Sequence, residues 1–398
     1  MRRYTFAFVF FVAGCGSGSS TSVTPSSTPP SDNGGSSGGG ATGGTPIPGG
    51  GGTTGGGGTT GGGGGMPGGG GGGGGKPGGG GGGGSGGTTA TPCSTTPMAL
   101  ASAETSATGI AVDDDDVYFA VTKDTNVADD FDIWRVSRFG GPAFEFAEGP
   151  SGSSLTINAT AVFTWSRDGF IRRWAKSGGA PTILYQHDPH DRVLAGFADA
   201  FGYIYFLTSN LGDFYLSRTP EDGGGPDTSV ATGMSYEESI TDFAFDPHHL
   251  WLAHPVGISG TAPDGGGPSI SMSWSPTPPP NQPPPYLEHV AADDTYVYAS
   301  TNAGDVLRAA QTDGAPFTVI GHPSGLVSAV RTDGGHVYVS SESFVDGRFH
   351  TTITRFSSDG ASADVLVDGD TTFGDFAFRG DSLYYTSLQD STVYRVCK

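Results

Sequence analysis

Short apolar segments and polar turns alternate through residues 93–398, and one pattern recurs seven times. An apolar segment is followed by a residue that is usually Asp, three further residues, one apolar residue and an aromatic residue. The seven aromatic residues, 40 to 47 positions apart, are Tyr118, Phe163, Tyr205, Trp251, Tyr298, Tyr338 and Tyr384. A repeat of this length, built from short strands and Gly/Pro turns, is typical of a β-propeller. The pattern therefore predicts an all-β fold, a seven-bladed β-propeller.

Each repeat contains four candidate strands, which in the first repeat are residues 110–112, 117–120, 133–136 and 143–146. They are rich in β-branched and aromatic residues and are separated by turn residues. A Gly/Pro turn such as Gly140-Gly141-Pro142 precedes the fourth strand. Glycine supplies the positive φ of a tight turn, and proline is tolerated on a strand at a sheet edge. We therefore expect four-stranded blades with the fourth strand outermost.

The two ends of the repeat region complement each other. The last repeat stops after its third strand, residues 392–396, while an extra strand at residues 97–101 precedes the first repeat. Pro97 lies 45 residues before Pro142, which is one repeat length. The N-terminal strand is therefore predicted to complete the last blade and close the ring, which removes the open ends of the strand array.

The first residues have the form of an export signal. Arg2 and Arg3 precede an apolar run, residues 4–13, that is too short to span a bilayer. The run ends in Val12-Ala13-Gly14-Cys15, which resembles the lipobox of bacterial lipoproteins. The resemblance implies removal of residues 1–14 and lipidation of Cys15, which would anchor the protein in a membrane. Gly16, where Asp would favour the inner membrane, implies the outer membrane or cell surface. The alternative is an ordinary signal peptide.

Two cysteines remain once Cys15 is assigned to the anchor. Cys93 lies just before the closing strand, and Cys397 ends the strand that should lie beside it. In an exported protein this pairing favours a disulfide over two buried thiols. In the chain-entropy model so long a loop contributes at most about 5 kcal/mol to stability.

Residues 15–92 form a low-complexity segment of Ser, Thr and Pro followed by nearly pure Gly. Such a segment buries too little apolar surface to fold, so we expect a disordered tether ahead of a domain at 93–398. Its random-coil reach is about 50 Å. Its many glycines do not follow a strand and precede no Lys-Ser or Lys-Thr, so they do not indicate a phosphate-binding loop.

The predicted propeller is strongly acidic. The chain carries a net charge of −21, and residues from Cys93 onward contain 16 basic and 39 acidic residues, a net −23. This balance argues against nucleic acid as a partner and disfavours contact with anionic lipid headgroups. Two interpretations stay open: a surface charged for solubility, which is favoured, and one that attracts a cationic ligand.

Candidate binding residues lie in loops, because the strands are committed to packing. We expect them on the face that carries the connections between blades and between second and third strands. Those connections are residues 123–132, 187–192, 234–238, 254–257, 275–289, 321–325 and 341–350. The candidate residues in them are Lys123, Asp129, Asp130, His187, His190, Tyr236, Pro280 and Pro285. Residues 275–285, a Pro-rich strip, should be extended and exposed and are either a docking strip or a stiff insertion.

Metal and catalytic signals are weak. The acidic run 113–116 lacks the spacing of an EF-hand and falls where the other repeats have turns, so turn chemistry is favoured over Ca²⁺. His187-Asp188-Pro189-His190 has two possible Zn²⁺ ligands but no supporting motif. The sequence contains no GxSxG or HExxH motif and no catalytic cysteine arrangement. We therefore predict no cofactor and no metal.

The repeats resemble those of TolB-like, NHL-like and surface-layer-associated propeller lipoproteins, in the Asp, Val-Tyr and Gly-Gly-x-Pro positions of residues 93–398. Those families include binding scaffolds and enzymes, so the resemblance implies the fold and leaves the activity open. The favoured hypothesis is a lipid-anchored cell-envelope propeller that binds a protein, peptide or glycan without catalysis. The alternative is a metal-dependent lactonase or lyase with its site over the central channel.

Overall fold

The computed structural model describes residues 93–123, 131–148, 155–165, 170–186, 192–210, 213–224, 228–233, 240–266, 269–276 and 284–398. These residues form strands and turns. Within the described ranges there is no helix long and apolar enough to cross a membrane. Cys15 and the rest of residues 1–92 lie outside the described residues.

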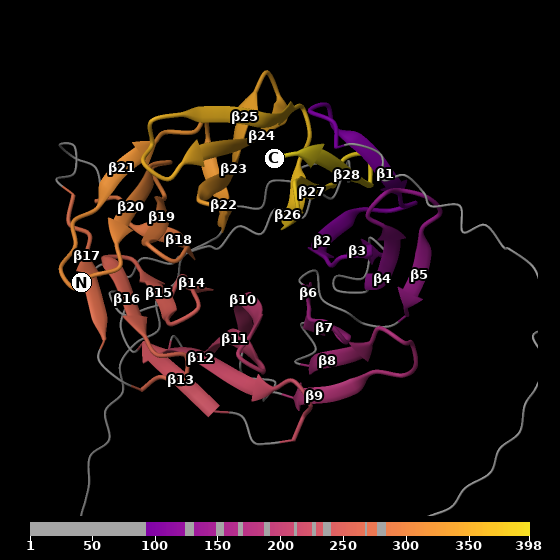
Figure 1. The fold of residues 1–398 in the computed structure, drawn as a ribbon, viewed down its shortest axis with the longest axis horizontal. Helices are drawn as coiled ribbons and strands as arrows, with labels where there is room; N and C mark the ends of the chain where they lie inside the picture. The colour runs from indigo at the N-terminus through magenta and orange to yellow at the C-terminus, as the bar shows by residue number, and fades with distance from the viewer. Residues whose placement is uncertain are drawn as a thin grey trace, which may run out of the picture. The chain divides into compact units, whose positions relative to one another are not determined.

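As the sequence predicts, the described strands form seven four-stranded antiparallel sheets arranged in a ring (Figure 1). We call the sheets blades one to seven in chain order, and the first strand of each blade lies innermost. Blades one to three contain β2 (Ala107–Val112), β3 (Asp116–Thr122), β4 (Phe131–Ser137), β5 (Phe144–Ala147), β6 (Leu155–Ile157), β7 (Ala161–Trp165), β8 (Phe170–Ala175), β9 (Thr182–Gln186), β10 (Arg192–Ala200), β11 (Tyr203–Asn210), β12 (Asp213–Pro220) and β13 (Thr228–Gly233).

Blades four to six contain β14 (Asp242–Phe245), β15 (Leu250–His254), β16 (Gly257–Thr261), β17 (Ile270–Ser273), β18 (Leu287–Ala292), β19 (Tyr296–Thr301), β20 (Val306–Ala310), β21 (Thr318–Gly321), β22 (Leu326–Asp333), β23 (His336–Val345), β24 (Arg348–Ser357) and β25 (Ala363–Gly369). Blade seven combines β26 (Phe373–Arg379), β27 (Ser382–Ser387) and β28 (Thr392–Cys397) with the N-terminal β1 (Met98–Ser102).

The first strand of blade one begins at Ala107, three residues before its predicted start. The register between β2 and β3 shifts between Ala107 and Ile110, which marks a β-bulge. Similar shifts occur near the start of β10, β18, β22 and β26. A bulge places an unpaired residue in the strand and breaks the alternation of apolar and polar positions, so the apolar pattern alone misses this end of the strand.

The apolar core is divided among seven clusters, and each cluster joins two neighbouring blades. The seven aromatic residues of the repeat are all at most 2% exposed, and each lies in the cluster shared with the following blade. Successive side chains of a strand point to opposite faces. Phe119, next to Tyr118, therefore packs into the cluster shared with blade seven. Each blade is thus held between its two neighbours.

The Asp of the repeat caps the turn between the first and second strands. Oδ1 of Asp113 accepts hydrogen bonds from the backbone N–H groups of Asp115 and Asp116 at 2.9 and 2.7 Å. The same pair of bonds forms at Asn158, Asp246 and Asp293. In blades four and five the other carboxylate oxygen accepts a hydrogen bond from the aromatic residue of the repeat. The acidic run 113–116 is therefore a turn, as the sequence favours.

An arginine on the third strand lies opposite the aromatic residue in six blades. The register pairs are Tyr118–Arg135, Phe163–Arg173, Tyr205–Arg218, Tyr298–Arg308, Tyr338–Arg355 and Tyr384–Arg395. Blade four has Gly260 opposite Trp251 instead. A Cβ at Gly260 would lie 2.3 Å from the Trp251 ring, so the larger ring leaves no room for a side chain there.

Two of these arginines also join neighbouring blades. Arg218 of blade three donates a hydrogen bond to the backbone oxygen of Pro263 in blade four at 3.0 Å. Arg308 of blade five donates to the backbone oxygen of Ser358 in blade six at 2.6 Å. Both acceptors lie between the third and fourth strands of the next blade. In these two pairs of blades the arginine therefore links the turn of one blade to the sheet before it.

The ring closes as the sequence predicts, because β1 pairs with β28 as the outer strand of blade seven. Leu100 of β1 lies in the cluster shared by blades seven and one. Arg379 of blade seven donates to both carboxylate oxygens of Asp114 in blade one, at 2.9 and 2.6 Å. A bidentate pair of this kind fixes orientation as well as distance. Closure thus combines a strand, a core cluster and an ion pair.

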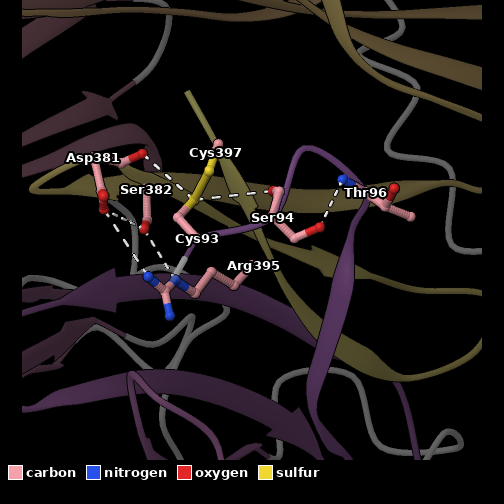
Figure 2. Close-up of a disulfide and its surroundings, with 7 residues drawn as sticks. All are labelled: Cys93, Ser94, Thr96, Asp381, Ser382, Arg395 and Cys397. Atoms are coloured by element: carbon pink, nitrogen blue, oxygen red, sulfur yellow. Dashed lines mark hydrogen bonds and ion pairs between the residues drawn. A yellow bond between two sulfur atoms is a disulfide. The ribbon is translucent and has the colours of Figure 1, made fainter. Parts of the chain in front are cut away.

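A disulfide joins Cys93 to Cys397 with their Cα atoms 5.3 Å apart, as the sequence predicts (Figure 2). The N–H of Cys397 donates to the backbone oxygen of Ser94 at 2.7 Å. Beside the disulfide, Nε of Arg395 donates to the hydroxyl of Ser382 at 3.0 Å (Figure 2). The beginning of the propeller is therefore held to its end by a covalent bond and by hydrogen bonds.

Candidate binding face

The two faces of the ring carry different connections. We call the face with the turns between first and second and between third and fourth strands the turn face. The opposite face carries the connections between second and third strands and between blades, and we call it the loop face. Cys397 pairs with Ser382, the first residue of β27, so the disulfide lies at the turn face. The chain therefore enters the propeller at the turn face.

The innermost strands of blades four to seven lie around the axis of the ring (Figure 1), and they carry four residues whose charges act on one another. They are Asp242 on β14, His289 on β18, Arg331 on β22 and Asp375 on β26. Arg331 pairs in register with the aromatic residue of its blade, and the other three lie two residues before the equivalent position. In blade one the residue opposite the aromatic side chain is Ala111. The channel therefore has a charged wall on blades four to seven.

The charges of this wall pair with each other. Oδ2 of Asp242 lies 3.6 Å from Nδ1 of His289, and Arg331 donates to Asp375 at 2.7 Å. Burial acts to lower the pKa of His289, but the hydrogen bond and charge of Asp242 outweigh it, so that pKa lies above its usual value. Asp375 raises the pKa of Arg331, and Asp242 adds to the rise from two blades away. The wall is polar and nearly charge-balanced.

Among the described residues, the second and third strands of blade six form the longest pairing. β23 and β24 form ten residue pairs, whereas β19 and β20 of blade five form five. Beyond the aromatic residue of the repeat, blade six has five more pairs than blade five, an extension of about 17 Å at the usual strand rise. Asp346 and Gly347, with φ of 51° and 79°, form its two-residue turn. The expectation of a connecting loop at residues 341–350 is therefore wrong, and we call these residues the tip hairpin.

One side of the tip hairpin is apolar. Phe344 faces Phe349 across the strands, with ring centroids 5.2 Å apart. Glu342 shares their side of the hairpin, because alternate residues of a strand point the same way. Leu326 of β22 pairs with Glu342 and so extends the same surface. Leu326 and Phe344 are 65% and 67% exposed. The loop face therefore carries an apolar surface on blade six.

The other side of the tip hairpin is charged. Nε2 of His350 lies 2.8 Å from Asp368, and Nδ1 lies 3.1 Å from Asp370. The hydrogen bond and charge of these carboxylates raise the pKa of His350. Arg348 lies 3.7 Å from Asp370. On the apolar side, burial raises the pKa of the Glu342 carboxyl. The hairpin thus combines an exposed apolar surface with several carboxylates.

The structure describes only two of the candidate binding residues. Lys123 follows β3, with Nζ 2.7 Å from Glu148 and 3.7 Å from Asp132. Pro285 lies just before β18 in blade five. The candidates outside the described residues are Asp129, Asp130, His187, His190, Tyr236 and Pro280. Lys123 and Pro285 belong to different blades, so the structure does not unite them in one site.

Several of the described histidines lie beside a carboxylate or a hydroxyl group. Nδ1 of His322 lies 2.7 Å from Asp305, and Nε2 of His254 lies 2.8 Å from the hydroxyl of Ser259. His249 contacts Asp246, the residue that caps its own turn. Among the residues that the structure describes, no three His, Cys, Asp or Glu side chains are grouped to hold a metal ion.

Two features of the structure escaped the sequence analysis although signals for them were present. The arginine opposite the aromatic residue recurs in six repeats, 10 to 17 residues after that aromatic residue. The tip hairpin contains Asp346-Gly347, a dipeptide typical of a two-residue hairpin turn, with Val345 before it and Arg348-Phe349 after it. The charged wall of the channel had no comparable signal, because its residues are separated by whole repeats.

No known family model matches the sequence, and no curated protein matches it. Solved structures do match. The chain is similar to a catalytically inactive virginiamycin B lyase from Staphylococcus aureus, solved with quinupristin, at 15% identity and a TM-score of 0.57, covering 76% of this chain and 99% of that one. It is also similar to the WD40 β-propeller domain of Doa1, at 12% identity and a TM-score of 0.55, covering 76% and 96%.

A third similar structure is YCF48 from Cyanidioschyzon merolae, at 13% identity and a TM-score of 0.54, covering 76% of this chain and 98% of that one. The three proteins differ in kind: one is a lyase and another is a WD40 domain. At these identities the likeness shows the β-propeller fold alone.

Proposed function

We propose that this protein is a lipid-anchored propeller of the cell envelope that acts as a non-catalytic binding or scaffold module. Its partner is a protein, peptide or glycan. The position of Cys93 at the turn face supports this proposal most directly. A tether ahead of Cys93, anchored through Cys15, would join the propeller at the turn face, on the side opposite the connections that carry the candidate binding residues.

The charge of the turn face fits this arrangement. Exposed carboxylates occupy its turns in several blades, at Asp114, Asp115, Asp222, Asp264, Asp294, Asp313, Asp359 and Asp381. Anionic lipid headgroups repel such a surface. A domain of this charge stays near a membrane only through its tether, and the tether does not require the domain to lie on the lipid.

Membrane fractionation of the Cys15→Ser variant tests the anchor. We expect the variant to leave the membrane fraction or to retain its signal segment, because the acylated sulfur is lost. Ser17→Ala, beside the anchor but outside the lipobox, is the matched control and should fractionate as the parent does. A Cys15→Ser protein that is processed and remains membrane-bound would contradict the proposal.

A second candidate function, a propeller enzyme with its site over the central channel, is favoured by one observation. Asp242, His289, Arg331 and Asp375 place acid, base and cation around the axis of the ring. A metal-dependent lactonase or lyase would need a bound ion there. Elemental analysis of the purified full chain separates the two candidates: a stoichiometric Ca²⁺ or Zn²⁺ lost in Asp242→Asn would favour the enzyme, and metal-free protein that still captures its partner would favour the binding module.

A further inference from the structure

Side chains from two repeat positions meet between neighbouring blades at the turn face. The cap position lies five residues before the aromatic residue of the repeat, and the bridging position lies three residues after the third-strand residue opposite that aromatic residue. Lys176, at the bridging position of blade two, donates to Asp113, at the cap position of blade one, at 2.6 Å. In the same way Glu221 of blade three accepts a hydrogen bond from Asn158 of blade two. At these junctions a donor therefore meets an acceptor.

The junction where the ring closes breaks this pairing. Between blades six and seven, Lys398 at the bridging position forms an ion pair with Asp333 at the cap position. Between blades seven and one, the cap position holds Arg379 and the bridging position holds Arg138. At the other three junctions the bridging residue is neutral, namely Pro263, Gln311 and Ser358. Two arginines repel each other, so the closing junction alone combines like charges at these two positions.

The two arginines of the closing junction differ in their partners. Arg379 holds both carboxylate oxygens of Asp114. In the part of the chain that the structure describes, the guanidinium of Arg138 donates no hydrogen bond and joins no ion pair, and it lies 4.7 Å from the centroid of the Phe139 ring. Its Nε is buried without an acceptor, although the side chain as a whole is partly exposed. A buried donor without an acceptor costs free energy, so this guanidinium is suited to an incoming anion.

The carboxylates near Arg138 have other partners. Asp114 is held by Arg379, whose hydrogen bond lowers the pKa of that carboxyl, with a smaller contribution from the charge of Arg138. Asp115 accepts from the N–H of Arg138 with its backbone oxygen, at 3.0 Å. Asp381 lies 4.0 Å from Arg395, which also donates to a neighbouring hydroxyl (Figure 2). The acceptor that suits Arg138 therefore comes from outside these contacts.

The surroundings of Arg138 select the kind of anion. A guanidinium binds the two oxygens of a carboxylate or a phosphate through parallel N–H groups. The propeller carries a net −23, and Asp114 and Asp115 are exposed in the adjacent turn. Repulsion from these charges grows with the charge of the ligand, which disfavours phosphate dianions and acidic polymers. A small, singly charged carboxylate meets the least repulsion.

We propose that the closing junction binds the carboxylate of a small molecule on Arg138. The ligand takes the part that Asp113 plays for Lys176 and Asp333 plays for Lys398. The site lies at the turn face, so it is separate from the binding function proposed for the loop face.

Nuclear magnetic resonance of the arginine Nε–H groups in the full chain tests the inference, because it observes the guanidinium itself. Sodium acetate replaces sodium chloride at constant ionic strength, and contacts with the Phe139 ring protons identify the Arg138 signal without a variant. We expect this signal to shift and saturate. At ten times the dissociation constant, acetate should also raise the melting temperature by about 2–4 °C.

Arg138→Gln should abolish the rise in melting temperature. The matched control is Arg348→Gln, which removes one positive charge from an exposed side chain on blade six and should keep the full rise. Inorganic phosphate should bind more weakly than acetate, and poly-L-glutamate should not compete with acetate. If Arg138→Gln does not fold, the titration of the parent still decides.

An Arg138 signal that does not saturate with acetate would overturn the inference, and so would an equal rise in melting temperature for the parent and Arg138→Gln. Loss of the rise in Arg348→Gln would mean that acetate responds to net charge alone. Tighter binding of phosphate would contradict a singly charged ligand, and competition by poly-L-glutamate would assign the site to a macromolecule. None of these results bears on Cys15 fractionation or on capture of a partner at the loop face.

Discussion

The turn face and the loop face of this propeller are built by opposite rules. At the turn face, one set of contacts repeats around the ring: an Asp or Asn caps the turn in four blades, and an arginine lies opposite the aromatic residue in six. On the loop face, blade six has a hairpin whose middle strands run five pairs further than those of blade five. The repeated contacts hold the ring together. The longer hairpin of blade six has no such repeated role, so we expect recognition there.

Removing the closing strand should have the largest effect on stability, because blade seven then loses its outer strand and the ring is no longer closed. Deletion of residues 93–102 removes β1, the disulfide and the burial of Leu100. We expect the melting temperature to fall by at least about 10 °C. The Cys93→Ser, Cys397→Ser variant keeps the strand and should fall less. A deletion variant that melts with the parent would contradict closure by β1.

A comparison of one buried and one exposed aromatic residue comes next in size. Trp251→Ala empties a fully buried site between blades four and five and should lower the free energy of unfolding by about 3–5 kcal/mol. Phe344→Ala, at the exposed tip, should change it by no more than about 0.5 kcal/mol. Urea unfolding of both variants measures the difference. Similar losses would mean that the tip hairpin is part of the core.

The capping Asp gives a smaller effect. Asp293→Ala removes the acceptor of two backbone N–H groups and of the Tyr298 hydroxyl and should cost about 1–3 kcal/mol of unfolding free energy. Asp293→Asn keeps an oxygen for the two N–H groups and should lose less. Asp294 is exposed in the same turn, so Asp294→Ala serves as the control. If Asp293→Ala and Asp294→Ala unfold alike, the cap does not stabilise the turn.

The channel wall predicts the smallest effect, a dependence of stability on pH. The pKa of His289 is raised in the folded protein by Asp242, so protonated His289 favours folding. The stabilisation is complete below the unfolded pKa of about 6.5 and is lost as pH rises through the higher folded pKa. Urea unfolding of the parent and of His289→Gln should therefore differ at pH 5.5 and converge in alkaline buffer. A difference that grows with pH would contradict the pairing.

Features that repeat were predictable from the sequence. Tyr118 and its six equivalents could be recognised because each performs the same packing role at a nearly constant spacing. The closing strand and the Cys93–Cys397 pair followed from the missing strand at the other end of the chain. The arginine opposite the aromatic residue recurs in six repeats and was predictable from the sequence in the same way.

Features that occur once were not predictable in the same way. Asp242 and His289 meet because the register shift between Leu287 and His289 sets which residues of β18 face blade four, and a shift of one residue would turn His289 away. The tip hairpin was predicted as a loop although Asp346-Gly347 indicates a turn, because most other second and third strands are shorter. The assignments of Cys15, Asp129, Asp130, His187, His190, Tyr236 and Pro280 remain predictions.

Site-specific photo-cross-linking in the native envelope tests most directly whether a partner binds the loop face and not the turn face. A benzophenone amino acid is placed at Phe344 on the loop face or at Phe139, an exposed aromatic residue in a turn of blade one at the turn face. The account predicts a discrete protein adduct from Phe344 and none from Phe139. An adduct from Phe139 alone, or from Phe344 to lipid or to a second copy, would contradict it.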